Sequence, residues 1–195
     1  MIEIKPALEL DGPGRRQAVE VFVDAFGDDF VALSKDRKRL ADGFEQLLTL
    51  DLFYVALLDG TPASITALTD GRQESFRADS TVLRKHFGLL RGTVVGTMFR
   101  REFAKAEPVA PGAASLEFVG TARAHQGKGV AKALLSHLLA LPQYKVYVLE
   151  EIADTNAPAL GLYTRLGFTE YRRRPVKHTR FTGINHYVSM KLVQD

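Results

Sequence analysis

The chain has 195 residues, of which 46% are hydrophobic and 25% charged, and its formal net charge is +3. The absence of cysteine excludes disulfides, thiolate metal sites and a cysteine nucleophile. No apolar run reaches the roughly eighteen residues that a membrane-spanning helix needs. We expect a single domain over residues 1–195, without a secretory signal or a membrane partner, and located in the cytoplasm.

A strand and two helices are predicted at the start of the chain. A strand over 2–6 and a turn at 11–14 lead into a helix through 18–26, where apolar side chains recur at helical spacing. Ser34 is expected to cap a second helix. The apolar stripe of that helix is formed by Leu40, Phe44, Leu47 and Leu48.

A β-hairpin and a further helical segment follow. Two apolar runs joined by Asp59-Gly60 predict the hairpin, over 53–58 and 63–68. Residues 79–104 repeat apolar side chains at helical spacing, but three glycines four residues apart each weaken a helix by about 1 kcal/mol relative to alanine. We therefore expect two short helices, or one that packs very closely. The predicted apolar face is Leu83, Phe87, Leu90, Val94 and Met98.

The second half of the chain predicts strand–helix–strand units. A loop over 107–114 precedes a strand at 116–121, and a glycine turn at 126–129 opens an amphipathic helix. The remaining elements are a strand, a helix stopped by a glycine, and two closing strands, over 146–149, 156–166, 168–174 and 187–193. This order predicts an α/β (α+β) fold in which helices flank a mixed sheet of about seven strands.

The glycine turn has a physical use. The first amides of a helix lack internal partners, the helix dipole adds positive charge there, and glycine lets a ligand approach the backbone. A strand followed by Gln126-Gly127-Lys128-Gly129 and a helix is therefore a candidate seat for a phosphate, although a simple turn is the commoner case. The spacing fits neither the Walker loop nor the dinucleotide fingerprint.

The same turn resembles a known motif. Gln126, Gly129 and Ala131 match the Gln–x–x–Gly–x–Ala form of the acyl-CoA pyrophosphate loop in the GCN5-related N-acetyltransferase (GNAT) superfamily. The strand at 116–121 sits where the fourth strand of that family sits. The family often has proline shortly after this strand, where this chain has Arg123, so the turn is expected to differ slightly.

A second motif lies thirty residues further on and also resembles the family. It consists of Asn156, Ala159, Leu162, Tyr163, Gly167 and Phe168. Read without the resemblance, this is a capped helix with a glycine stop, and Tyr163 is a packing tyrosine. Two motifs in the right order indicate the GNAT fold, strongly over 115–170 and by element order in the first hundred residues.

The resemblance implies where acetyl-CoA, the acyl donor, is bound. Val119, Gly120 and Thr121 would offer backbone groups to the pantetheine arm and the carbonyl oxygen, and Asn156 would lie near the arm. The pyrophosphate would be held by Gln126, Gly127, Lys128, Gly129, Val130 and Ala131.

The resemblance also implies two catalytic residues. Tyr163 resembles the tyrosine that protonates the leaving sulfur. Glu117 resembles a glutamate of some small-amine acetyltransferases that takes the proton of the amine through a water. An ordinary strand-edge carboxylate remains an open interpretation, and a local bulge would change the face that Glu117 presents. We expect no metal, because Asp, Glu and His show no metal-ligand spacing.

The acceptor is expected to be a primary amine of a small molecule or peptide, with residues 79–104 forming part of its wall. A homodimer is left open, because dimers are frequent in the family. A non-catalytic acyl-CoA-binding regulatory module of the same fold is the alternative. A nucleic-acid-binding protein ranks last, since the basic cluster 172–180 lacks interleaved aromatics. His125, His137, His178 and His186 are expected at the surface, with the last two near the acceptor.

Overall fold

The computed structural model describes residues 1–103, 110, 112–176, 179 and 183–194. The strands are β1 (Ile2–Pro6), β2 (Phe53–Leu58), β3 (Thr61–Thr69), β4 (Ala113–Thr121), β5 (Val146–Ala153), β6 (Thr169–Pro175) and β7 (His186–Val193). The helices are α1 (Gly12–Phe26), α2 (Arg37–Leu47), α3 (Ser80–Phe87), α4 (Leu89–Phe103), α5 (Val130–Leu139) and α6 (Ala157–Arg165). Short 3₁₀ turns are η1 (Ala7–Glu9), η2 (Leu50–Leu52) and η3 (Arg123–His125).

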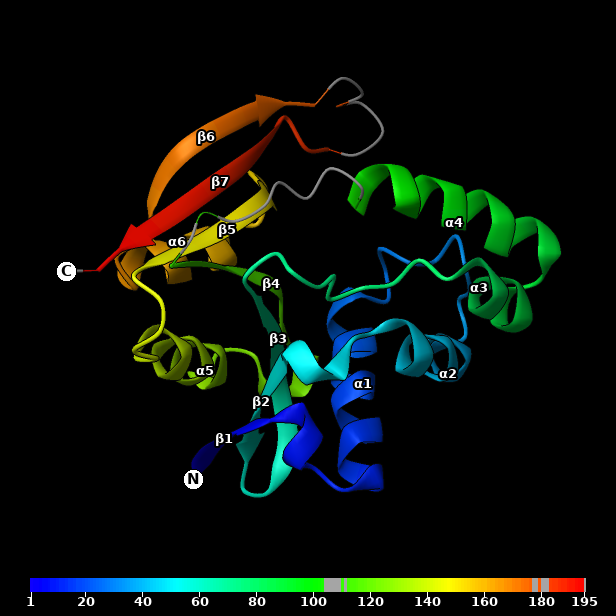
Figure 1. Ribbon diagram of the computed structural model, residues 1–195, viewed down its shortest axis with the longest axis horizontal. Coiled ribbons are helices and arrows are strands. Elements are labelled where there is room, and N and C mark those ends of the chain that lie inside the picture. The colour runs from blue at the N-terminus through cyan, green and yellow to red at the C-terminus, as the bar shows by residue number, and fades with distance from the viewer. Residues whose placement is uncertain (104–109, 111, 177–178, 180–182, 195) are drawn as a thin grey trace.

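The seven strands form one mixed sheet in the order β1-β2-β3-β4-β5-β7-β6. The β4–β5 pair is parallel and the other neighbouring pairs are antiparallel. This confirms the predicted fold class, with helices on both faces of a mixed sheet (Figure 1). No helix in the described ranges is long and apolar enough to cross a membrane.

Each face of the sheet carries its own apolar core, because successive side chains of a strand point to opposite faces. The first core gathers α1, α2 and α3 over one face, and phenylalanines dominate it. The second core gathers α5 and α6 over the other face. Its largest fully buried side chain is Tyr147, whose hydroxyl donates to the carbonyl oxygen of Leu138 at 2.8 Å.

The cap of α2 differs from the prediction. The carboxylate of Asp36 accepts hydrogen bonds from the amides of Lys38 and Arg39 at 2.9 and 3.2 Å, so Asp36 is the N-cap. Ser34 Oγ instead accepts from the amide of Asp36 at 3.0 Å. The predicted start was two residues early, because an anionic carboxylate next to the positive helix end is the stronger cap.

The described part of the predicted helical segment 79–104, up to residue 103, forms two helices, which was one of the two expectations. The break between them lies at Gly88, with φ +87°. The predicted apolar face holds for α3 but is wrong for Leu90 and Val94 of α4, and the side chain of Met98 lies outside the described ones. Leu90 and Val94 are 84% and 60% exposed, whereas Val95 is buried. The break resets the helical phase, so α4 does not continue the stripe of α3.

Two predicted boundaries on the central strands are also corrected. β4 begins at Ala113 rather than Leu116, so the predicted loop over 107–114 ends earlier; residues 104–109 and 111 lie outside the described residues. β5 continues to Ala153, well past the predicted end at Leu149. Glu150 and Glu151 follow Leu149 in this strand and interrupt the apolar run from which its end was predicted.

Candidate active site

The parallel strands β4 and β5 separate in the middle of the sheet. Ala113 to Ser115 pair with Val146 to Val148, and within the described residues the ladder between these strands ends there. Beyond this point β4 stays paired with β3, and β5 stays paired with β7. The backbone ladder between β4 and β5 is therefore interrupted in the middle of the sheet, beyond Ser115 and Val148.

A β-bulge on each strand accompanies the separation. On β4 the register shifts, because Ile65 of β3 pairs with Gly120 and Ala67 pairs with Glu117, so that β4 has one extra residue between these pairs. Phe118 lies in this bulge with φ +52°. The extra residue puts the side chains of Glu117 and Phe118 on the same face, that of α1 and α2. On β5 the shift lies between Leu149 and Ile152.

The carboxyl group of Glu117 is held by two buried hydroxyls. Ser75 Oγ, from the segment between β3 and α3, donates to Glu117 Oε2, and Ser115 donates from the same strand. Burial raises the pKa of Glu117 above its usual range, while these two hydrogen bonds act in the opposite direction. No charged side chain of the described residues contributes to this pKa. Glu117 is thus a desolvated carboxyl without a cationic partner there.

The glycine turn forms the predicted seat at the start of α5. After η3 the chain passes through Gly127 and Gly129, with φ +74° and +76°. A Cβ at either position would meet nothing within 4 Å, so the turn leaves open space for a ligand. Gly129 is the N-cap and no side chain caps the helix, so the first amides of α5 remain available to an anion. Gln126 and Lys128 are exposed beside them.

Arg123 stands where the resemblance would lead us to expect proline, and it makes contacts that a proline there could not make. Its backbone amide donates to Asp24 Oδ2 at 2.6 Å, and its guanidinium group pairs with Asp28. Arg37 joins this cluster through Asp28 at 2.9 Å. The entrance of the glycine turn is therefore tied to the end of α1 and the start of α2.

Tyr163 lies on the opposite face of the sheet from Glu117. Its side chain is 5% exposed, packs beside Phe168 with ring centroids 6.1 Å apart, and belongs to the core that contains Leu116 of β4 and Leu149 of β5. The Tyr163 hydroxyl has no hydrogen-bond partner among the described residues. Every fully buried side-chain polar atom of the described residues does have a partner, so this hydroxyl is not fully buried. The hydroxyl is therefore accessible, and burial raises the pKa of Tyr163 far above its usual range.

Asn156 caps α6, as the pattern predicts. Its side-chain oxygen accepts from the amide of Ala159 at 3.2 Å, and Gly167 ends the helix with φ +93°. The cap fixes the start of the helix that carries Tyr163. The side chain of Asn156 is exposed next to the continuation of β5.

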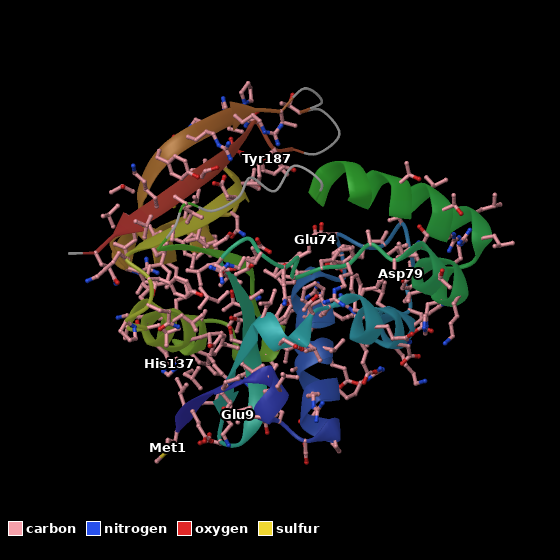
Figure 2. The ribbon with its side chains drawn as sticks, in the orientation of Figure 1. Met1, Glu9, Glu74, Asp79, His137 and Tyr187 are labelled. Atoms are coloured by element: carbon pink, nitrogen blue, oxygen red, sulfur yellow. The ribbon has the colours of Figure 1, made fainter. Side chains whose placement is uncertain are left out.

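The histidines and arginines lie as follows. His137 is exposed on the outer side of α5 (Figure 2). His186 lies 3.5 Å from the carboxylate of Asp154, while His178 lies outside the described residues.

The three arginines of β6 each pair with a glutamate, in the pairs Arg172–Glu150, Arg173–Glu170 and Arg174–Glu151. Lys177 and Arg180 lie outside the described residues, so the described part of the basic cluster is charge-paired.

Sequence reasoning missed Ser75 and Ser115. Ser115 could have been found, because alternate residues of a strand share a face and Ser115 is two positions before Glu117. Ser75 lies 42 residues away in a segment without periodicity, so only the fold brings it to Glu117.

The comparisons with known proteins point to one family. The model of the acetyltransferase (GNAT) family matches residues 26–168. No curated protein matches the sequence. Several solved structures are similar in fold. The N-acetyltransferase from Staphylococcus aureus Mu50 has a TM-score of 0.61 at 17% identity, over 97% of this chain and 100% of that one.

Two further structures are similar over the full length. The ribosomal-protein-S18-alanine N-acetyltransferase from Escherichia coli has a TM-score of 0.57 at 18% identity, over 100% of this chain and 96% of that one. The structure of yncA from Salmonella typhimurium with its cofactor acetyl-CoA has a TM-score of 0.55 at 18% identity, over 100% and 94%. At these identities the likeness establishes the fold. Because the family model spans the glycine turn, the separated strands β4 and β5 and the helix of Tyr163, the chain belongs to the acetyltransferase (GNAT) family.

Proposed function

We propose that this protein transfers an acetyl group from acetyl-CoA to a primary amine of a small molecule or peptide, by direct attack in a ternary complex. The observation that carries the proposal is the separation of β4 from β5 beyond Ser115 and Val148. The start of α5 has no side-chain cap, and the Tyr163 hydroxyl has no partner among the described residues on the same face of the sheet. A buried carboxyl faces the other side.

Acetyl-CoA supplies the activated acyl group, and the glycine turn suits its pyrophosphate. The open space at Gly127 and Gly129 admits phosphate oxygens to the first amides of α5. Gln126 and Lys128 are exposed where they could add a donor and a charge. The remaining contacts of the seat would come from Val130 and Ala131.

The chemistry needs three further groups. Backbone groups of Val119, Gly120 and Thr121 would orient the pantetheine arm and stabilise negative charge on the carbonyl oxygen, and Asn156 would lie beside the arm. Tyr163 would give its proton to the departing sulfur, because a phenol is protonated at neutral pH.

Glu117 would act as the general base from the acceptor side. An amine is protonated at neutral pH and must lose a proton before it attacks. A desolvated carboxyl with a raised pKa is a better proton acceptor than an exposed one. Because no cationic side chain of the described residues neutralises Glu117, the ammonium group of the acceptor can serve as its counter-ion.

The acceptor would enter from the face of α1 and α2, where Glu117 lies. Helix α3 packs on α2 there, since the ring of Phe87 closes against Gly43, and α4 packs on α3. We therefore propose that the segment 79–104 forms part of the acceptor wall, and that residues 1–195 act as a single catalytic domain.

A thiol-release assay over panels of polyamines, aminoglycosides, aromatic amines and peptides tests this function. We expect acetyl-CoA-dependent release with at least one amine, and a loss of about a hundredfold or more in kcat/KM for Glu117→Gln. Tight acetyl-CoA binding without turnover on any amine would favour a non-catalytic acyl-CoA-binding module.

A further inference from the structure

The segment between β3 and α3 carries a buried serine to Glu117. This segment, residues 70–79, is held against the chain that follows α2. Thr49 Oγ1 donates to the carbonyl oxygen of Glu74 at 2.8 Å. The backbone amide of Thr49 donates to the carbonyl oxygen of Ser75 at 2.9 Å. Glu74 marks the segment in Figure 2. The backbone position of Ser75 is therefore fixed independently of its side chain.

The side chain of Ser75 contacts the carboxyl group of Glu117. It is 3% exposed, and its hydroxyl donates to Glu117 Oε2. The strand under Glu117 is fixed separately, because Thr66 Oγ1 donates to the backbone oxygen of Glu117 at 2.9 Å. The backbone of Glu117 is held by β3, and its carboxylate is held by the hydroxyls of Ser75 and Ser115. A carboxylate has about four lone-pair sites, so it can still accept a proton.

We propose that Ser75 is a positioning residue, which orients the Glu117 carboxylate for proton abstraction and sets the pH range in which the acceptor amine is deprotonated. The inference rests on the proposed base role of Glu117. It assigns a task to the segment 70–79, which contains none of the motif residues. It also links the base to α2, because Thr49 anchors the segment directly after that helix.

The sign of the effect follows from the groups around Glu117. Burial raises the pKa of Glu117, and the hydroxyls of Ser75 and Ser115 lower it because they stabilise the ionised form. No charged group on the described parts of the neighbouring elements opposes or adds to them. Removing the Ser75 hydroxyl therefore raises the pKa of Glu117. The base must be ionised, so the acidic limb of the pH–rate profile moves upward.

The test compares Ser75→Ala with Thr49→Val. The control removes a hydroxyl that holds the same segment but does not touch Glu117. Two quantities are measured for each: the pKa of the Glu117 carboxyl by ¹³C NMR titration, assigned with Glu117→Gln, and the pH dependence of kcat/KM. For Ser75→Ala we expect both to rise by about one pH unit, and for Thr49→Val neither moves. Ser115→Ala should shift both in the same direction as Ser75→Ala.

The outcomes separate the inference from the proposed function. An unmoved carboxyl titration in Ser75→Ala, or an equal shift in Thr49→Val, would overturn the role of Ser75 and leave Glu117 as a candidate base. A carboxyl titration that moves while the kcat/KM profile stays in place would remove Glu117 from the base role, and the inference would fall with it.

Discussion

Replacing Tyr163 by phenylalanine separates catalysis from stability. The change removes one oxygen that has no hydrogen-bond partner among the described residues, so no protein contact of that hydroxyl is lost. Removing a mostly buried hydroxyl without a partner is close to neutral, and we expect the free energy of unfolding to change by less than about 0.5 kcal/mol. If Tyr163 is the general acid, kcat falls by about a hundredfold to ten-thousandfold.

Tyr147 is the matched control, because it lies in the same core. Its hydroxyl is buried and donates to the carbonyl oxygens of Leu138 at 2.8 Å and Leu141 at 3.3 Å. Tyr147→Phe leaves those carbonyls without this donor, at a cost of about 1–3 kcal/mol. The melting temperature should fall by about 2–4 °C for each kcal/mol, with kcat retained.

Thermal and urea denaturation measure the stability of both variants, and a thiol-release assay measures their activity. We expect Tyr163→Phe to lose activity and keep its stability, and Tyr147→Phe to lose stability and keep its activity. Turnover by Tyr163→Phe equal to that of the native protein would refute the acid role. A large loss of stability in that variant would show that the hydroxyl has a partner in the protein.

Two further predictions concern stability. The pKa of Glu117 is higher in the folded than in the unfolded chain. The contribution of this carboxyl to the free energy of unfolding is therefore fully present below the unfolded pKa and is lost as pH rises through the folded pKa. Glu117→Gln should therefore gain stability relative to the native protein between pH 4 and pH 8, and an equal difference at both pH values would contradict this. Gly92→Ala places a Cβ 2.6 Å from the carbonyl oxygen of Leu83 and should cost about 1–3 kcal/mol in chemical denaturation. Gly96→Ala, which meets only the end of the Leu83 side chain at 3.0 Å, should cost less, and equal costs would count against close packing at Gly92.

The sequence predicts those elements whose signals are local. The strand at Ile2–Pro6, the hairpin at Asp59-Gly60 and the end of α6 at Gly167 all follow from neighbouring residues, and the structure has them there. Both family motifs also lie within single turns and helices. Their elements could therefore be placed before any tertiary contact was known.

The errors arise where tertiary contacts decide. β5 runs past Leu149 because its backbone stays paired with β7 up to Ala153, while Glu150 and Glu151 form ion pairs with arginines of β6. No period in the sequence of β5 reveals these partners on other strands. The face of α4 depends on the angle at Gly88, which sequence spacing does not specify. The contact of Ser75 with Glu117 likewise exists only in the folded chain.

Calorimetric titration of acetyl-CoA tests the central claim most directly. The native protein is compared with Gly129→Glu and with Gly60→Glu, a control with the same charge change at another glycine of positive φ, 82°, in the β2–β3 turn. Both substitutions strain the backbone by about 1–2 kcal/mol. We predict binding by the native protein and the Gly60 variant, and at least about tenfold weaker binding by Gly129→Glu, where the carboxylate meets the phosphates. No binding by the folded native protein, or equal binding by all three, would contradict the account.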